Sequence, residues 1–237
     1  APWQAQQARG ALAQRLRGFS REWPELGEAV MALQQIDPGL ANGLVQRVIP
    51  APGANLGSSL LFFLSALTRG DLAGWLGRGA VARLEEAGRG DLIGRLTNSF
   101  GQLARLAEPP AVGEWQALFV PLFDGETERQ VRLFIRRHSR DGEDNDDRDK
   151  TRFIVELELD RMGDIQLDGL VRGQTFDLIL RSPDALPHST KRDITEIFTE
   201  GLAITGFTGT LAFQIARKFP VSPIDDILAV EHHGLLV

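Results

Sequence analysis

The spacing of hydrophobic residues changes near Pro109-Pro110. Before this point, apolar residues recur three and four positions apart, as one face of an α-helix requires. The clearest series is Leu92, Leu96, Phe100 and Leu103, and an earlier one is Leu26, Val30 and Leu33. We therefore expect a helical domain over residues 1–108. Pro38-Gly39 should end its first long helix, and residues 49–53, with two prolines and a glycine, should form a connector.

After Pro110, apolar and polar residues alternate, which is typical of strands with one buried face. The apolar series are Leu118/Val120/Leu122, Val131/Leu133/Ile135, Phe153/Val155/Leu157/Leu159, Ile165/Leu167/Val171 and Phe176/Leu178/Leu180. Gly163-Asp164 and Arg172-Gly173 separate the last three series and suit tight hairpins. Residues 152–181 are thus predicted to form an antiparallel meander of three strands, with one or two earlier strands beside it.

A helix and a closing strand should follow this meander. Over residues 190–202, the positions Ile194, Ile197, Phe198 and Leu202 share one helical face. Leu211, Phe213 and Ile215 then alternate in a final strand. A helix with one apolar stripe must cover a sheet with one apolar face. We therefore predict an α+β domain over residues 109–237, a small antiparallel sheet packed with one main helix. Whether the tail from Phe219 docks on it stays open.

A short repeat in the helical half predicts two helix boundaries. Arg69-Gly70-Asp71-Leu72 recurs as Arg89-Gly90-Asp91-Leu92. In each copy we expect the glycine to end one helix in a left-handed conformation and the aspartate to cap the next. The alternative, an integrin-type recognition loop, requires an extracellular context that the chain does not show.

Composition and charge exclude several classes of function. The chain lacks cysteine, which rules out disulfides, thiol catalysis and cysteine-ligated metals. Residues 1–108 hold 11 basic and 9 acidic side chains, and residues 109–237 hold 15 and 23. The acidic second half argues against binding of nucleic acid. No apolar run approaches the roughly 20 residues of a membrane span. We therefore expect a cytoplasmic protein without a membrane span.

Candidate chemistry is sparse. The acidic residues 141–149 lie in a stretch resembling a calcium loop, but the sixth position is Asp146 instead of glycine and the twelfth is Arg152 instead of glutamate. A solvated loop between two strands is the preferred interpretation, and the role of residues 139–150 stays open. Histidines and serines fall in no metal or nucleophile motif. We therefore expect neither catalysis, nor a metal, nor a cofactor.

A group of arginines on one expected strand is the best candidate for a partner surface. It consists of Arg129, Arg132, Arg136 and Arg137. Such a group could bind an acidic protein partner, form an ordinary solvated sheet face, or contact nucleic acid. The neighbouring acidic residues oppose the last of these.

One hairpin resembles a known family. Leu157-x-Leu159-x-x-Met162-Gly163-x-Ile165-x-Leu167 is similar to the signature of the C-terminal domain of flagellar hook-length control proteins. The order of elements after it, a strand, a helix from Thr190 and a closing strand, also looks like the family's. Two positions depart from the pattern, because Leu159 stands for the family's proline and Met162 for its leucine.

The resemblance implies a bacterial, non-enzymatic role in the flagellum. The family's domain works with the cytoplasmic domain of the type III export switch protein, and members can themselves be exported through the flagellar apparatus. No cofactor would be needed. The alternative is an unrelated cytoplasmic scaffold or interaction protein that uses the same small α+β fold. The sequence leaves open the partner's identity, the oligomeric state, whether the two halves pack together and whether a longer N-terminal segment precedes residue 1.

Overall fold

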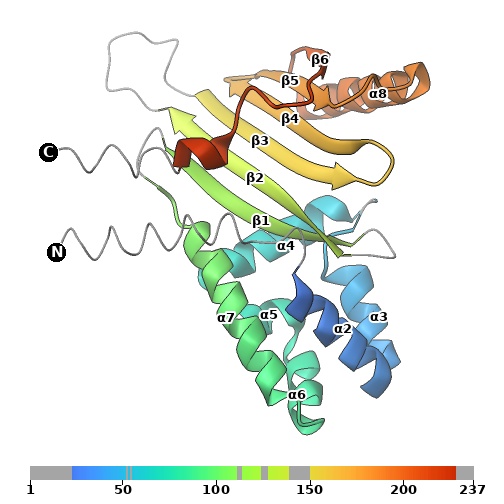
Figure 1. Ribbon diagram of the computed structural model, residues 1–237, viewed down its shortest axis with the longest axis vertical. Helices are drawn as coiled ribbons and strands as arrows, with labels where there is room; N and C mark the ends of the chain where they lie inside the picture. The colour runs from blue at the N-terminus through green and yellow to red at the C-terminus, as the bar shows by residue number, and fades with distance from the viewer. Residues whose placement is uncertain are drawn as a thin grey trace, which may run out of the picture. The chain divides into compact units, whose positions relative to one another are not determined.

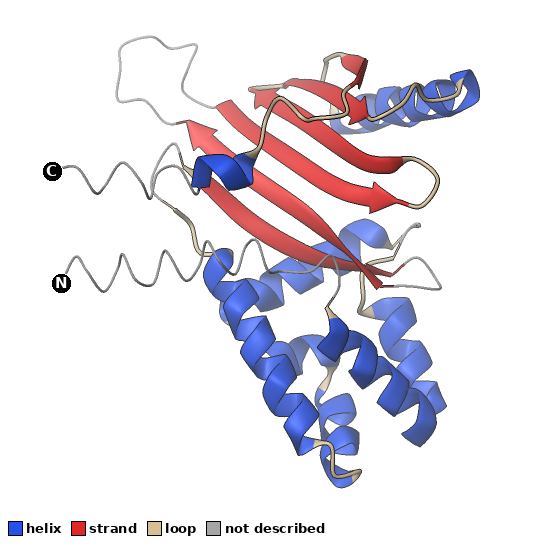
Figure 2. Ribbon diagram, viewed as in Figure 1, coloured by secondary structure: helices blue, strands red, loops and turns tan. Residues whose placement is uncertain are grey.

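The computed structural model describes residues 23–51, 53, 55–110, 114–123, 128–138 and 150–227, with only the main chain at residues 47, 128, 129 and 138. Helices dominate the first half of these residues and strands the second (Figure 2), which confirms the mixed α+β class. Contacts define two compact units among them. The helical unit takes residues up to Glu108 together with Leu118–Val131, and the sheet unit takes Pro109–Ala117 and residues from Arg132 onward.

The helices of the helical unit follow one another with short connections (Figure 1). They are α2 (Pro24–Ile36), α3 (Pro38–Arg47), α4 (Leu56–Arg69), α5 (Leu72–Leu76), α6 (Arg78–Glu86) and α7 (Gly90–Leu106). Pro38 ends α2 as predicted, but it also begins α3, which the sequence analysis missed. Proline is suited to the first turn of a helix, and the side chain of Asp37 caps α3 by accepting from the Leu40 N–H at 3.0 Å.

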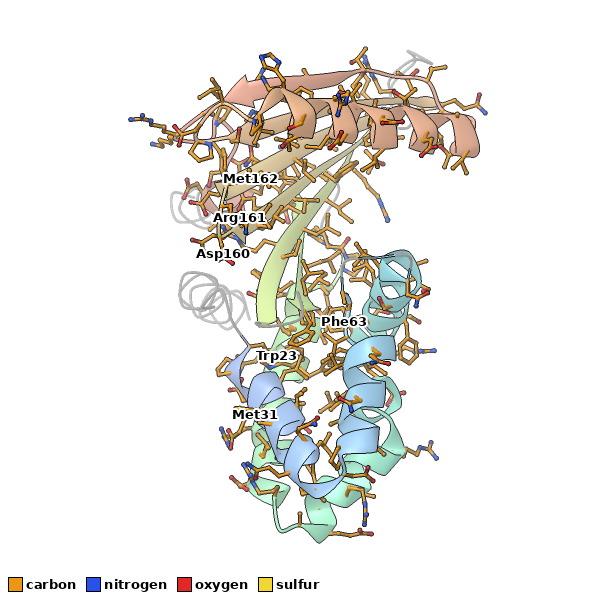
Figure 3. All side chains as sticks on the ribbon, turned by 90° about the vertical axis from the view of Figure 1, so that its right-hand side faces the viewer. Trp23, Met31, Phe63, Asp160, Arg161 and Met162 are labelled. Atoms are coloured by element: carbon orange, nitrogen blue, oxygen red, sulfur yellow. The ribbon has the colours of Figure 1, made fainter. Side chains whose placement is uncertain are left out.

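Four aromatic side chains form the centre of the helical unit. Trp23 and Trp75 stack with ring centroids 5.8 Å apart, and Phe63 meets Trp75 edge-on at 4.9 Å. Phe100 stacks on Trp75 at 5.9 Å. Each indole N–H is satisfied, as burial of tryptophan requires: Trp23 donates to a serine hydroxyl of α7 and Trp75 to a main-chain carbonyl after α3. In Figure 3, Trp23 and Phe63 point into the unit, whereas Met31 points outward.

The Arg-Gly-Asp repeat behaves as predicted in only one of its two copies. Gly70 ends α4 with φ 65°, and Asp71 caps α5 by accepting from the Gly74 N–H at 2.8 Å. In the second copy the left-handed glycine is Gly88, with φ 74°. Asp91 therefore falls inside the first turn of α7 and forms no capping hydrogen bond there. For the second copy the predicted boundary was wrong by two residues.

In the described part of the chain, six strands form one sheet in the order β1–β2–β3–β4–β5–β6. They are β1 (Trp115–Phe123), β2 (Glu128–His138), β3 (Lys150–Leu159), β4 (Gly163–Arg172), β5 (Thr175–Ser182) and β6 (Leu211–Ile215). Strands β2 to β5 pair antiparallel, so the predicted meander is confirmed. β6 pairs parallel to β5, and the connection is α8 (His188–Thr205), since parallel neighbours need a crossover.

The predicted hairpin motif lies in the apolar core of the sheet unit. Leu157 of β3 is directly opposite Ile165 of β4. Gly163 begins β4 with φ 69°, and the Met162 N–H donates to the Leu159 carbonyl at 3.1 Å to close the turn. The buried centre of this core is Ile165, Leu180 and Leu186, packed against Leu157, Leu159, Met162, Leu167, Ile194 and Phe213. All five apolar residues of the motif are therefore part of one core.

A row of aromatic rings links α8 to the same face of the sheet. Phe153 of β3 contacts Phe176 of β5 at 5.6 Å between centroids, and Phe176 contacts Phe198 of α8 at 5.5 Å. Phe153 can reach across β4 because Gly169 lies directly opposite it. A Cβ on Gly169 would collide with the ring of Phe153. The missing side chain thus makes room for the aromatic row.

We expect Gly169→Ala to destabilise the sheet unit by about 1–3 kcal/mol, because the ring of Phe153 must leave its rotamer. Urea unfolding followed by circular dichroism measures this change. Gly201→Ala is the matched control: Gly201 lies in α8 with open space around it, so alanine should raise stability by up to about 1 kcal/mol. Equal stability of Gly169→Ala and the unmodified protein would contradict the packing described.

Candidate interaction surface

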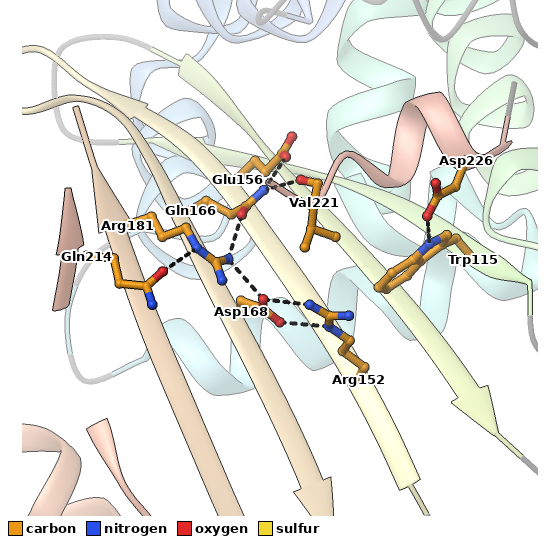
Figure 4. Close-up of polar contacts among 9 residues, drawn as sticks. All are labelled: Trp115, Arg152, Glu156, Gln166, Asp168, Arg181, Gln214, Val221 and Asp226. Atoms are coloured by element: carbon orange, nitrogen blue, oxygen red, sulfur yellow. Dashed lines mark hydrogen bonds and ion pairs between the residues drawn. The ribbon is translucent and has the colours of Figure 1, made fainter. Parts of the chain in front are cut away.

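The other face of the sheet carries a row of polar side chains, which we call the polar row. Its members are Arg132, Glu156, Gln166, Arg181 and Gln214, each directly opposite the next in the strands β2 to β6. The Gln166 amide donates to Glu156 Oε1 at 2.9 Å, and Arg181 donates to Gln166 Oε1 at 2.9 Å and to Gln214 Oε1 at 3.0 Å (Figure 4). Arg132 completes the row with an ion pair to Glu156 at 3.2 Å.

Asp168 lies beside the polar row and binds two arginines. Its carboxylate accepts from Arg152 Nε at 2.9 Å and Nη2 at 2.7 Å, and from Arg181 Nη1 at 2.9 Å. Asp168 is 6% exposed and Arg181 5%. Burial alone would raise the pKa of Asp168, but the hydrogen bonds from Arg152 and Arg181 outweigh it and leave this pKa below its ordinary value. The carboxylate therefore stays charged between two cations.

The C-terminal segment, residues 216–227, covers this polar face. The Gln166 amide donates to the Val221 carbonyl at 2.8 Å, and the Trp115 indole donates to Asp226 Oδ2 at 2.9 Å (Figure 4). Ile165 and Gln166 are consecutive in β4, so their side chains point to opposite faces. The segment therefore lies on the face opposite the one that α8 contacts. The tail, whose position the sequence left open, docks on the sheet unit as far as Asp226.

The groups of the polar row satisfy one another, which limits the chemistry they can perform. Each charged side chain in it donates to or accepts from a neighbour, as buried polar groups must. Among the described residues, no three histidine or acidic side chains gather in a way that could hold a metal ion. We interpret the polar row as the element that fixes strand register, because a slip of one residue would place its members on the apolar face.

The structure separates the arginines predicted to form a partner surface. Arg132 and Arg136 share the polar face, where Arg132 pairs with Glu156 and the Arg136 guanidinium lies 4.5 Å from the centroid of the Trp115 ring. Arg137 is exposed and points to the other face. Arg129 lies in β2, but its side chain is outside the described residues. Of the four predicted arginines, Arg137 is therefore the one for which the structure describes an exposed side chain.

Several other candidates from the sequence lie outside the described residues. These are the acidic residues 141–149, the side chain of His138, and His232 and His233. His188 is described and begins α8. Among the described residues, no helix is both long and apolar enough to cross a bilayer.

The end of the chain after β5 exposes large apolar side chains. Although α8 has 18 residues, none of them is buried. Ile197 is 70% exposed and Ile204 83%, and Ile215 of β6 is 65% exposed. Single exposed apolar residues are common, whereas several on neighbouring elements favour an interaction surface. We refer to Ile197, Ile204 and Ile215 as the exposed isoleucines.

Sequence reasoning found the polar face but missed that it is buried. The signal was present, because Arg152, Glu156, Gln166, Asp168 and Arg181 all occupy polar positions of the alternation. Alternation says which side chains share a face, and it does not say what covers that face. The cover comes from a distant segment, in which Val221 lies 55 residues after Gln166.

Comparison of the chain with family models, with curated proteins and with solved structures gave no match.

We expect Asp168→Asn to lower the free energy of unfolding by about 3 kcal/mol, because it leaves two arginines without their counter-charge, one of them buried. Chemical denaturation at neutral pH measures it. Asp225→Asn, which changes an exposed carboxylate in the covering segment, should alter stability by no more than about 0.5 kcal/mol. If both variants unfold like the unmodified protein, Asp168 does not hold the polar face together.

The same aspartate should give the protein a specific dependence on acid. The folded-state pKa of Asp168 is lowered, so its contribution is fully present above the unfolded-state pKa, about 3.9. It is lost as the pH falls from there through the folded-state pKa. We expect the free energy of unfolding of Asp168→Asn to depend less on pH below about pH 4 than that of the unmodified protein. An unchanged acid dependence in the variant would contradict the assignment.

Proposed function

We propose that this chain is a non-enzymatic protein-interaction module related to flagellar hook-length control, which acts in the cytoplasm on the type III export switch. The observation that carries the proposal is the β3–β4 hairpin. The apolar residues on which the resemblance rests pack in one core. They are Leu157, Leu159, Met162, Ile165 and Leu167. The motif positions therefore have the structural role in this chain that the resemblance implies, a turn at Gly163 with apolar residues of both strands on one face.

The arrangement after the hairpin supports the same proposal. β5 is followed by α8 and then by β6, the order of elements that the resemblance implies. We also propose that α8 is the main helix of this fold and that it partly covers the apolar face, through Ile194 and Phe198. The incomplete burial of α8 leaves apolar surface for a partner.

The expected partner is the cytoplasmic domain of a flagellar export switch protein. Of the arginines predicted to contact it, Arg132 and Arg136 bind within the sheet unit, so their substitution would disturb the fold as well as the surface. Arg137 can be changed without breaking a contact described here. Arg161 provides a matched control because it is also exposed, and it lies on the turn between β3 and β4 (Figure 3).

We expect the 237-residue chain to bind this domain with micromolar or tighter affinity in isothermal titration calorimetry. Arg137→Glu should weaken binding about tenfold, as loss and reversal of one interfacial charge commonly does. Arg161→Glu makes the same change of charge elsewhere and should bind like the unmodified chain. Circular dichroism confirms that both variants are folded.

Absence of heat with the unmodified chain would contradict the export-switch proposal and leave only a shared fold, which does not assign function. Equal weakening by Arg137→Glu and Arg161→Glu would keep the partner but remove Arg137 from the contact. In that case the effect would reflect the overall charge of the sheet unit.

A further inference from the structure

β6 is the last strand of the sheet, and its outer edge faces no other strand of the described residues. All five of its side chains are exposed or half-buried. An edge of this kind presents main-chain N–H and C=O groups that can pair with a further strand.

The hydrogen bonds to β5 establish which residues of β6 present those groups. The Leu178 N–H donates to the Thr210 carbonyl at 2.8 Å, and the Ala216 N–H donates to the Ser182 carbonyl at 2.9 Å. In a parallel pair, alternate residues direct both main-chain groups to the same neighbour. Positions 210, 212, 214 and 216 therefore face β5. The residues that face outward are Leu211, Phe213 and Ile215.

The sequence of β6 lacks the features that usually block an edge. Its five residues, Leu-Ala-Phe-Gln-Ile, include no charge and no proline, whereas natural edge strands are commonly protected by lysine, proline or a bulge. The strand at the other edge, β1, differs. It contains Pro121, which removes a donor.

We propose that β6 pairs with β6 of a second copy of this chain, antiparallel and about a two-fold axis through Phe213. This arrangement puts Leu211 opposite Ile215 of the second copy and Phe213 opposite its own equivalent. The outward-facing residues of one strand then meet the outward-facing residues of the other, as an antiparallel hydrogen-bonded ladder requires. The contact is self-complementary, which is the condition for a closed dimer.

Side chains favour the same register. Leu211 and Ile215 lie on the same face, so the pairing covers Ile215, which is 65% exposed in the single chain. Residues 206–216 carry no charge, so no like charges oppose each other within the two paired strands. Arg217 of each copy lies opposite position 209 of the other.

The first test is the mass of the 237-residue chain in sedimentation velocity over a range of concentrations. We expect a reversible dimer of twice 26.1 kDa. Ile215→Lys should shift the chain to monomer, because two lysines then enter the paired edge. Ile204→Lys is the matched control: Ile204 is even more exposed, at 83%, but lies on α8, so this variant should still dimerise.

The second test reads the register directly. Ala212 of one copy should oppose Gln214 of the other in a pair with Cα atoms about 4.5 Å apart, which a disulfide can bridge. Because the chain has no cysteine, single-cysteine variants can be mixed. A mixture of Ala212→Cys and Gln214→Cys should form a cross-linked dimer on oxidation, and each variant alone should form much less. Because Gln214 accepts from Arg181, circular dichroism first establishes that Gln214→Cys is folded.

A chain that stays monomeric at every concentration overturns the proposal. So does a dimer that survives Ile215→Lys, or one in which the mixed cysteine variants do not cross-link preferentially, since either places the contact elsewhere. These outcomes do not depend on binding to an export switch protein, so the two proposals fail or succeed separately.

Discussion

The buried guanidinium of Arg181 is the group on which the sheet unit depends. It is 5% exposed and donates to Asp168 and Gln166 of β4 and to Gln214 of β6. A buried cation is costly unless its partners are in place, and here they come from strands on both sides of β5. A register shift in either strand would remove them and would turn the apolar residues of that strand away from α8. The hydrogen bonds of Arg181 thus also stabilise the hydrophobic core on the opposite face.

The elements that protect this contact come from opposite ends of the sheet unit. Trp115 begins β1, and Asp226, which accepts from its indole, lies 111 residues later. Between them the chain crosses every strand and α8 before the segment at Val221 reaches Gln166. Burial of the polar row therefore depends on contacts between residues far apart in the sequence. Without the segment at Val221 and Asp226, water would hydrate the polar face. The docking of this segment and the pairing of the strands beneath it therefore stabilise each other.

The local sequence patterns predicted the helices and strands. The features that these patterns did not predict depend on contacts between residues far apart in the sequence. The alternation from Phe153 onward indicated β3, β4 and β5 correctly because each strand shows its period within a few residues. Pro38 was understood as a helix end but not as a helix start, since proline serves both. For the candidate surface, the sequence placed Arg132 and Arg136 on one face but gave no sign that Glu156 and Trp115 would engage them. Burial of a polar face depends on what lies above it, and residues 219–227 show no periodicity that says where they dock.

The two faces of the sheet differ in how completely the chain itself covers them, and this difference bears on function. On the polar face, the chain supplies its own cover, and Arg132, Arg152 and Arg181 pair with Glu156 and Asp168. On the apolar face, α8 is packed through Ile194 and the aromatic row but has no buried residue, and Ile197, Ile204 and Ile215 stay exposed. All three follow β5, within the α8–β6 part of the chain. Met31, Leu61 and Phe62 of the helical unit are exposed as well, so exposed apolar surface is not confined to this part of the chain. We propose that the group on α8 and β6 contacts other protein surfaces. In the function that we propose, the buried charges fix the register of the core, and α8 and the β6 edge are left open to another chain.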